Sequence, residues 1–320
     1  MISIDEIRDA AEFLRGRIHR TPLLSARSIG DRAGVKLWLK PENLQRTGSF
    51  KVRGVLNCIR QMSDDQKARG LVTISAGNHA QAVAWAAAAE GVAATVVMPE
   101  NASPAKVEAS RGYGANVVLH GDMFGAFKRM EDLRDEHGYT LLHPFDDPAV
   151  MAGQGTVGLE ICEDLPDVDV LVVGIGGGGL ISGIATAMRA LRPGVRIVGV
   201  EPFGAAAMTE AMRAGEPVRL ERIDTIADGL SAPAASARTL EHVRALVDDV
   251  VLVDDAAITN AMHALLERAK LLAEPAGAAA TAAVLAGVAG CRPGDRVVCV
   301  VSGGNIDLQR MRTLLDGAAS

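Results

Sequence analysis

The chain of 320 residues is long enough for two lobes, since domains commonly contain ~100–200 residues. Its formal net charge of −6 gives no support to the binding of nucleic acid or of an anionic membrane. No uninterrupted apolar run of ~18 residues occurs and residues 1–7 lack the pattern of a signal peptide, so neither a membrane span nor secretion is predicted. The cysteines are scattered through apolar stretches and are predicted to be reduced, structural thiols of a cytoplasmic protein: Cys58, Cys162, Cys291 and Cys299.

Apolar residues at helical spacing predict a helix over residues 5–18, and alternation predicts a strand over 35–39. Further strands are predicted at 71–74, 94–98, 116–119, 168–173, 195–200, 249–253 and 296–301. Helices are predicted between these strands. Two of them start at about residue 81 and after residue 103, and the others cover residues 122–136, 179–191, 256–272 and 276–288. Because strands that alternate with helices are joined by right-handed crossovers, we expect an α/β protein with parallel sheets.

A lysine stands at the predicted start of a helix. Lys51 follows Phe50 and precedes a series of apolar positions, and we expect Thr47 or Ser49 to cap this helix. Desolvation and the positive end of a helix both lower the pKa of a lysine, and a neutral amine is what Schiff-base chemistry needs. Taken alone, this stretch favours a structural lysine, whose aliphatic part packs against the protein and whose ammonium group points to water.

A glycine-rich loop, Gly-Ile-Gly-Gly-Gly-Gly-Leu over residues 174–180, lies between a predicted strand and a predicted helix. Such a loop lets the backbone approach a ligand closely and presents N–H groups to a phosphate. Gly174, Gly176 and Gly179 also satisfy the dinucleotide fingerprint, and Glu201 ends the next strand, about where a ribose-binding acid would stand. An NAD-dependent oxidoreductase is therefore an alternative, although it leaves Lys51 unexplained.

Four stretches, in order, resemble the serine/threonine dehydratases among the pyridoxal-phosphate enzymes of the tryptophan-synthase-β fold type. Residues 42–54, Glu-Asn-Leu-Gln-Arg-Thr-Gly-Ser-Phe-Lys-Val-Arg-Gly, resemble the family's Schiff-base lysine motif, and residues 75–81 resemble its substrate-carboxylate turn. Residues 176–180 resemble its phosphate loop, and residues 302–305 resemble its pyridine-nitrogen motif. The resemblance spans nearly the whole chain, and the combination is much more specific than the glycine loop alone.

The resemblance implies two doubly wound parallel-sheet domains, as in fold type II pyridoxal-phosphate enzymes. Residues 1–69 and 148–320 would form the large cofactor-binding domain, and residues 70–147 a small mobile domain that closes over substrate. The chain ends soon after Ser302, so we expect a catabolic or stand-alone enzyme without a feedback-regulatory domain, and residues 315–320 as a fraying tail. Relatives are commonly homodimers or homotetramers.

The same resemblance implies roles for the site residues. Lys51 would be the catalytic residue, bound to pyridoxal 5'-phosphate at rest and then the base at the substrate Cα. Phe50 would lie against the pyridine ring, unless it is ordinary core packing, and Asn78 would hydrogen-bond the ring hydroxyl. The phosphate would be bound by Gly176, Gly177, Gly178, Gly179 and Leu180. The substrate carboxylate would be bound by Ser75, Ala76, Gly77, Asn78 and His79, with an ordinary packed histidine as the alternative for His79.

Ser302 would be a weak partner for the pyridine nitrogen, and this favours β-elimination over transamination. The implied reaction removes the β-hydroxyl of L-threonine or L-serine and yields 2-oxobutanoate or pyruvate with ammonia. Related serine racemases place a serine at the position of Ala76, so racemisation is expected to be weak or absent. Residues 227–233 depart from the family pattern, which leaves open another substrate such as 3-hydroxyaspartate or phenylserine. A protein that stores or senses the cofactor without turnover is a further alternative.

A cation site is the last implied feature. Glu201 and the carbonyl of Ala205 match a stretch that holds a cation in several relatives, but Ala207 lacks the oxygen ligand that some relatives supply. A divalent ion is therefore less expected than a monovalent one, and Glu201 is alternatively a surface acid at a strand end. Glu274 is expected near the cofactor, without a defined role.

Overall fold

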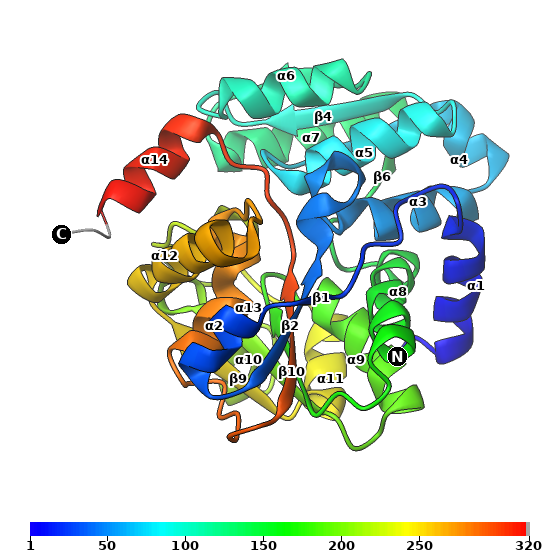
Figure 1. Cartoon of the computed structure of the whole chain (residues 1–320). Helices are drawn as coiled ribbons and strands as arrows, with labels where there is room; N and C mark the ends of the chain where they lie inside the picture. Colours follow the sequence, from blue (N-terminus) through cyan, green and yellow to red (C-terminus); the bar gives the residue numbers. More distant parts are fainter. Residues whose placement is uncertain (318–320) are drawn as a thin grey trace.

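Two open sheets organise the chain in the computed structural model, which describes residues 1–317 (Figure 1). Within these residues, the larger sheet has six strands in the order β1 (Leu24–Ser25), β2 (Lys36–Pro41), β10 (Arg296–Val301), β7 (Val170–Gly174), β8 (Arg196–Pro202) and β9 (Asp249–Val253). The second has four described strands, in the order β5 (Asn116–Leu119), β4 (Ala94–Met98), β3 (Leu71–Ile74) and β6 (Thr140–Leu141). Every neighbouring pair is parallel except β1 with β2. The predicted α/β class with parallel sheets is confirmed.

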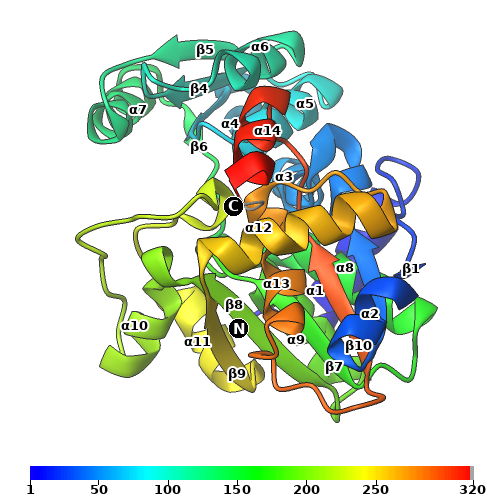
Figure 2. The same ribbon diagram turned by 60° about the vertical axis from the view of Figure 1, so that its left-hand side comes forward.

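Helices cover both faces of each sheet (Figures 1 and 2). The described α-helices are α1 (Ile4–Leu14), α2 (Arg27–Ala33), α3 (Lys51–Gln61), α4 (Asp64–Arg69), α5 (Asn78–Ala89), α6 (Pro104–Gly112), α7 (Met123–His137), α8 (Pro148–Asp164), α9 (Gly179–Leu191), α10 (Ala207–Ala214), α11 (Ala237–Leu246), α12 (Asp255–Ala264), α13 (Pro275–Leu285) and α14 (Leu308–Gly317). On the larger sheet, α2, α12 and α13 pack on one face, and α8, α9 and α11 on the other. On the second sheet, α5 and α6 cover one face and α7 the other.

The apolar runs of the central strands follow from this layering. In β7, Val170 and Val172 point into the cluster with α12 and α13, whereas Leu171 and Val173 point into the cluster with α8 and α9. Because a parallel strand is buried on both faces, it carries apolar residues at consecutive positions rather than at alternate ones. This pattern is why the predicted strands at 71–74, 94–98 and 296–301 match the structure residue for residue, and the edge strands at 116–119 and 249–253 match as well, although they are less buried.

Three predicted helix boundaries are wrong by several residues. The first helix ends at Leu14 rather than near residue 18, because the chain turns through Gly16 with φ +75°. The helix expected over 256–272 ends at Ala264 and continues as a π-helical turn up to Lys270, whose φ is +59°. Helix α5 begins earlier than expected, at Asn78. Helix α14 runs to Gly317, so only its last turn overlaps the predicted tail, and residues 318–320 lie outside the described residues.

The predicted cap of the lysine helix is also wrong. Helix α3 begins at Lys51 with Phe50 in the N-cap position, and no side chain caps it. Ser49 is extended, with φ −161°, and pairs with Gly303 in an isolated β-bridge. Thr47 lies in a short 3-10 turn with φ +60°. Both hydroxyls are therefore held away from the helix end that they were expected to cap.

Helices α8 and α9 cross in backbone contact, and this contact predicts a stability effect. A Cβ atom at Gly183 would lie 2.2 Å from the carbonyl oxygen of Met151 and 2.6 Å from the amide nitrogen of Gly155. Neither atom can move as a flexible side chain would, so we expect Gly183→Ala to lower the free energy of unfolding by about 1–3 kcal/mol. Urea denaturation measures it, with Gly194→Ala as the control because Gly194 has open space around its Cα. Equal effects of both substitutions would contradict the packing argument.

The cysteines are free thiols in buried or partly buried positions, as predicted. Cys58 and Cys299 are buried, Cys162 and Cys291 are partly buried, and all four are free thiols. Burial raises the pKa of the Cys162 thiol to about 11, so it stays protonated at neutral pH. No helix within residues 1–317 has the length and apolar character needed to cross a membrane.

Candidate active site

The strand orders place the candidate site where the two sheets meet. In the larger sheet the order reverses between β10 and β7, and in the second sheet it reverses between β3 and β6. Ligands of open α/β sheets bind outside the carboxyl ends of the strands at such reversal points. The glycine loop follows β7, Ser302 follows β10, the turn of residues 75–79 follows β3, and residues 142–145 follow β6. Three of these four segments are motifs singled out by sequence.

Backbone hydrogen bonds join the lysine motif to the segment after β10. The N–H of Phe50 donates to the carbonyl oxygen of Ser302 at 3.1 Å, and the N–H of Gly304 donates to the carbonyl oxygen of Gly48 at 2.9 Å. The Ser302 hydroxyl makes only a long contact, 3.4 Å, to the carbonyl oxygen of Ala276. Segments from the two ends of the chain therefore form one wall of the site.

Lys51 is the first residue of α3 and points toward the segment that follows β6. Its Nζ donates to the carbonyl oxygen of Pro144 at 2.8 Å and lies 5.2 Å from the centre of the Phe50 ring. Burial lowers the pKa of the Lys51 amine to about 8. A substantial fraction of this amine is therefore neutral near physiological pH, as a nucleophile or base requires.

Strain and unpaired polar atoms surround the lysine. Thr47 has a positive φ, which costs about 1–3 kcal/mol in a residue other than glycine and is typical of functional sites. The hydroxyl oxygens of Thr47 and Ser49 are buried and have no hydrogen-bond partner within residues 1–317. Because buried polar groups are usually paired, these orphan hydroxyls indicate a place where a ligand supplies the partner.

The turn of residues 75–79 leads from β3 into α5 and leaves the helix end open. The N–H of Gly77 donates to the hydroxyl of Ser75 at 3.1 Å, Ala76 lies between them, and no side chain caps α5. The Nε2 of His79 donates to the carbonyl oxygen of Leu142 at 3.1 Å, so its buried Nδ1 carries the lone pair. Burial, helped by Lys51, lowers the pKa of His79 to about 3. His79 is therefore neutral, and the N–H groups of the helix end remain as carboxylate donors.

Asn78 is held by Glu274 and Asn305, two side chains that both lie next to Gly303. Its Nδ2 donates to Oε1 of Glu274 at 2.5 Å, and its Oδ1 accepts from Nδ2 of Asn305 at 2.7 Å. The same Nδ2 of Asn305 also donates to the carbonyl oxygen of Thr47 at 2.6 Å. Burial raises the pKa of the Glu274 carboxyl to about 7. The orientation of the Asn78 amide is thereby fixed, with one N–H still free for a ligand.

The glycine loop presents unpaired amides at the start of α9. None of the N–H groups of Gly176, Gly177 and Gly178 donates a hydrogen bond to any group in the described part of the chain, and no side chain caps α9. Gly178 has φ +91°, which a residue with a side chain would adopt only with strain. Leu180 packs in the core, so only its backbone is available to a ligand. Orphan amides at a positive helix end suit a phosphate.

Sequence analysis missed the segment after β6 as part of the site. A Cβ atom at Gly177 would lie 2.3 Å from the ring of Phe145, and one at Gly179 would lie 2.9 Å from its Cβ. Phe145 thus packs on the glycine loop, while the preceding Pro144 accepts the hydrogen bond from Lys51. The resemblance placed a domain boundary next to this segment, at residue 147, and no local pattern distinguishes a boundary from a contact with the site.

Glu201 is not the surface acid that its place at a strand end suggested. It is fully buried, and its oxygens accept from the N–H of Met208 at 2.7 Å, the N–H of Thr209 at 2.8 Å and the Thr209 hydroxyl at 2.6 Å. It therefore caps α10, and a carboxylate that is fully buried does not reach a ribose. Ala205 is buried nearby, and no cluster of three or more His, Cys, Asp or Glu side chains within residues 1–317 has a metal-binding arrangement.

A small pocket lies beside Glu274 and Asn305. Its volume is about 30 Å³, and its lining includes Ser103, Lys106 of α6, Asp228 and Arg310 of α14. Asp228 forms an ion pair with Arg310 at 2.5 Å and lies 3.7 Å from Nζ of Lys106. A helix that covers the second sheet thus contacts the segment of residue 228 at this pocket.

Comparisons with known proteins agree with this geometry. A model of the family "Pyridoxal-phosphate dependent enzyme" matches residues 14–303. An L-threonine ammonia-lyase of Thermotoga maritima is 43% identical over 317 residues, which cover 99% of this chain and 79% of that protein. The solved structure of maize serine racemase has a TM-score of 0.92 and 39% identity, and covers 100% of this chain and 99% of its own. The processed form of threonine deaminase isoform 2 from Solanum lycopersicum has a TM-score of 0.91 and 34% identity, and covers 98% of this chain and 94% of its own.

Proposed function

The chain belongs to the family of pyridoxal-phosphate dependent enzymes, and we propose that it is an ammonia-lyase that eliminates the β-hydroxyl of L-threonine or L-serine. The observation that carries this proposal is Lys51, a partly buried amine of lowered pKa in a motif that is hydrogen-bonded to the segment of Ser302. Superposition alone does not separate two reactions, since a serine racemase and a threonine deaminase superpose almost equally well, whereas the sequence relative from Thermotoga maritima is a threonine ammonia-lyase.

The residues present fit the cofactor. The orphan amides of Gly176, Gly177 and Gly178 match a phosphate, and the free N–H of Asn78 matches a ring hydroxyl. Ser302 offers a neutral hydroxyl whose present contact is long, so it is available to a ring nitrogen without protonating it. When bound, pyridoxal phosphate supplies an electron sink that stabilises negative charge at the substrate Cα. The weak partner at Ser302 favours loss of a β-leaving group over transamination.

The protein's own groups then account for substrate binding and proton transfer. The N–H groups at the start of α5 bind the substrate carboxylate, and the neutral amine of Lys51 takes the Cα proton. The β-hydroxyl leaves as water, and hydrolysis of the resulting enamine, as its imine, releases ammonia and a 2-oxo acid. Threonine gives 2-oxobutanoate and serine gives pyruvate.

A panel of β-hydroxy amino acids tests this function. We expect ammonia and a 2-oxo acid from L-threonine, and more slowly or equally from L-serine, without added nicotinamide cofactor. Faster turnover of 3-hydroxyaspartate or phenylserine would show that this amino acid is the preferred substrate of the same elimination reaction. Absence of turnover with every member, in protein that binds pyridoxal phosphate, would favour a storage or sensing protein and contradict the proposed function.

Ala76 predicts the balance between elimination and racemisation. A methyl group has no proton to deliver to Cα, whereas the related racemases have a serine here. We expect Ala76→Ser to raise D-serine formation from L-serine by at least tenfold, measured by chiral chromatography, while pyruvate formation changes less. Ala76→Gly serves as the control, because glycine, like alanine, has no proton to deliver. D-serine formed by the unaltered protein at a rate rivalling pyruvate would show that Ala76 does not decide the outcome.

The lowered pKa of Lys51 predicts the pH dependence of cofactor loading. Burial shifts the pKa down to about 8, so the neutral, nucleophilic form is the minor species below pH 8 and the major one above it. The loading rate of the apo-protein is therefore expected to rise with pH and level off above a midpoint near 8, followed by absorbance after mixing. A midpoint near the ordinary lysine pKa of 10.5 would contradict the burial of this amine.

The family resemblance also supports proposals about domain movement, assembly and a bound cation. We infer that residues 70–147 move as a small domain against residues 1–69 and 148–320, and the pairing of Lys106 with Asp228 supports closure at this junction. We also infer that the protein is a homodimer or a homotetramer. We infer a cytoplasmic location, because its cysteines are free thiols. A cation bound by Glu201 and the carbonyl oxygen of Ala205 stays a prediction. We expect a monovalent ion there, because the Glu201 oxygens already accept three hydrogen bonds.

A further inference from the structure

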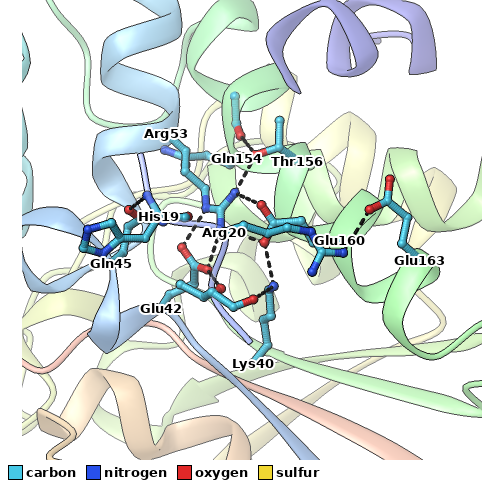
Figure 3. A network of polar contacts seen from close by, with 12 residues as sticks. His19, Arg20, Lys40, Glu42, Gln45, Arg53, Gln154, Thr156, Glu160 and Glu163 are labelled. Carbon is cyan, nitrogen blue, oxygen red and sulfur yellow. Dashed lines mark hydrogen bonds and ion pairs between the residues drawn. The ribbon is translucent and has the colours of Figure 1, made fainter. Parts of the chain in front are cut away.

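Four charged side chains lie together behind the helix that carries Lys51 (Figure 3). Lys40 is the last residue but one of β2, Glu42 follows the strand, Arg53 is in the first turn of α3, and Glu160 is in α8. The side chains of Lys40 and Glu42 are 0% exposed, that of Arg53 1% and that of Glu160 14%. We call this set the buried charge network. The function proposed above uses none of these residues.

Arg53 is the centre of the network, and each of its three nitrogens is bonded. Its Nε and Nη2 donate to the two oxygens of Glu42 at 2.7 and 2.8 Å. Its Nη1 and Nη2 donate to the two oxygens of Glu160 at 2.7 and 2.9 Å. The Thr156 hydroxyl accepts a further bond from Nη1 at 3.0 Å. All five N–H groups of the guanidinium are therefore used, and the geometry fixes both the position and the plane of the group.

Lys40 and Thr21 complete the network. Nζ of Lys40 donates to Glu160 at 2.6 Å and to the carbonyl oxygen of Thr21 at 2.7 Å, and the Thr21 hydroxyl donates to Glu42 at 2.6 Å. Two cations and two carboxylates thus balance. Burial acts to raise the pKa of Glu42, but the Arg53 guanidinium outweighs it and holds that pKa below its usual value. Glu42 is therefore ionised and paired with Arg53 at neutral pH.

Stability alone is a poor reason for such a network. Burying charges is costly, and replacing a buried ion pair by apolar side chains is often neutral or stabilising. What a bidentate network provides is a fixed geometry between the elements that it joins. Here it joins the end of β2, the first turn of α3 and the C-terminal half of α8.

The joined elements are those that place Lys51. Residues two apart on a helix point to nearly opposite sides, so Arg53 holds α3 from the side away from the Lys51 amine. No side chain caps α3, so its first turn lacks the usual fixation. A Cβ atom at Gly153 of α8 would lie 2.6 Å from Cα of Gly54, so α3 and α8 are in backbone contact. Helix α8 also follows directly on the segment whose Pro144 accepts the bond from Lys51.

We propose that Arg53, Glu42 and Glu160 are positioning residues for Lys51, which hold the first turn of α3 so that the amine meets cofactor and substrate at the required place. The proposal rests on the proposed function and adds residues that do not touch the reacting atoms. It commits to a geometric role, since substitutions that keep every charge but shorten or simplify a side chain should still impair the site.

The test uses Arg53→Lys and Glu42→Asp in the full-length protein. Both keep the charge, but lysine loses the guanidinium fork and aspartate is shorter by one methylene. We expect the dissociation constant for pyridoxal phosphate to rise at least tenfold and kcat to fall ~10²-fold, with KM changed less than about threefold, because misplacement by 1 Å has effects of that order. Cofactor titration by absorbance and near-UV circular dichroism gives a measurement independent of turnover.

Arg296→Lys is the matched control. Arg296 also pairs with both oxygens of one carboxylate, that of Asp169, at 2.8 Å each, but it lies at the opposite end of β10 from Ser302. This substitution is expected to leave cofactor affinity and the spectrum unchanged. If Arg53→Lys does not fold, Glu160→Asp at the partly exposed rim of the network replaces it.

The outcomes separate the two proposals. The unaltered protein must first bind pyridoxal phosphate through Lys51, and failure at this step counts against the proposed function. Given such binding, folded network variants that match Arg296→Lys in cofactor affinity, spectrum and kcat would overturn the positioning role. Loss of affinity and of kcat in the network variants alone would support it.

Discussion

Lys51→Ala is expected to lower the rate of ammonia release from L-threonine by at least ~10³-fold, because it removes both the anchor of the cofactor and the base at Cα. Lys51→Arg should be as damaging, since a guanidinium stays protonated and cannot accept a proton. The measurement is a steady-state assay of ammonia and 2-oxo acid, together with an absorbance spectrum of each purified variant. The visible band of the bound cofactor should disappear in both.

A matched lysine substitution makes this result specific. Lys128 is exposed on α7, and Lys128→Ala should leave both the activity and the spectrum unchanged. Circular dichroism and the unfolding midpoint of Lys51→Ala show whether the fold is intact, and removal of a partly buried cation should not lower that midpoint in the apo-protein. Retention of more than a tenth of the activity by folded Lys51→Ala would refute the role assigned to this residue.

Arg53→Met is expected to lower the free energy of unfolding of the apo-protein by about 3–5 kcal/mol, the second large effect. The substitution leaves the Glu42 carboxylate fully buried beside an apolar side chain, and breaking a buried ion network from one side has this order of cost. Urea denaturation, followed by circular dichroism, measures the change. The loss should be larger than that of Arg296→Lys, whose ion pair is partly exposed.

A double substitution separates the network from simple side-chain size. Arg53→Met combined with Glu42→Leu removes both members of the fully buried pair, so part of the lost stability should return. Cofactor affinity should not return, because apolar packing does not restore the fork that fixes α3. A single variant that loses less than about 1 kcal/mol would contradict the burial and pairing described for Arg53.

Patterns that are local in sequence predicted most of the fold. The strands after residue 70 carry β-branched and other apolar side chains at consecutive positions, and this follows from burial on both faces of a parallel sheet. The four motifs were predicted to form one site, and the hydrogen bonds between Phe50 and Ser302 and between Asn78 and Asn305 bring three of them into contact. Each motif contains the glycine, lysine or amide that its chemistry requires, so local sequence was sufficient.

Features that depend on distant partners could not be predicted in this way. Thr47 and Ser49 fit the composition of a helix cap, but pairing of Ser49 with Gly303 holds the segment extended. Glu201 resembled an exposed strand-end acid because nothing in its own neighbourhood shows that α10 folds back onto it. Arg53 stands inside the lysine motif, but its partner Glu160 is 107 residues away in the sequence, so the buried pairing could not be predicted.

The most direct test of the central claim is the product stoichiometry from L-threonine. The purified protein, loaded with pyridoxal phosphate and without any nicotinamide cofactor, is incubated with L-threonine, and both products are quantified by nuclear magnetic resonance and an ammonia assay. We expect 2-oxobutanoate and ammonia in equal amounts, and we expect neither product from the Lys51→Ala variant. If the loaded protein forms neither product, or if Lys51→Ala forms both at an unchanged rate, the proposed function of Lys51 in an ammonia-lyase is contradicted.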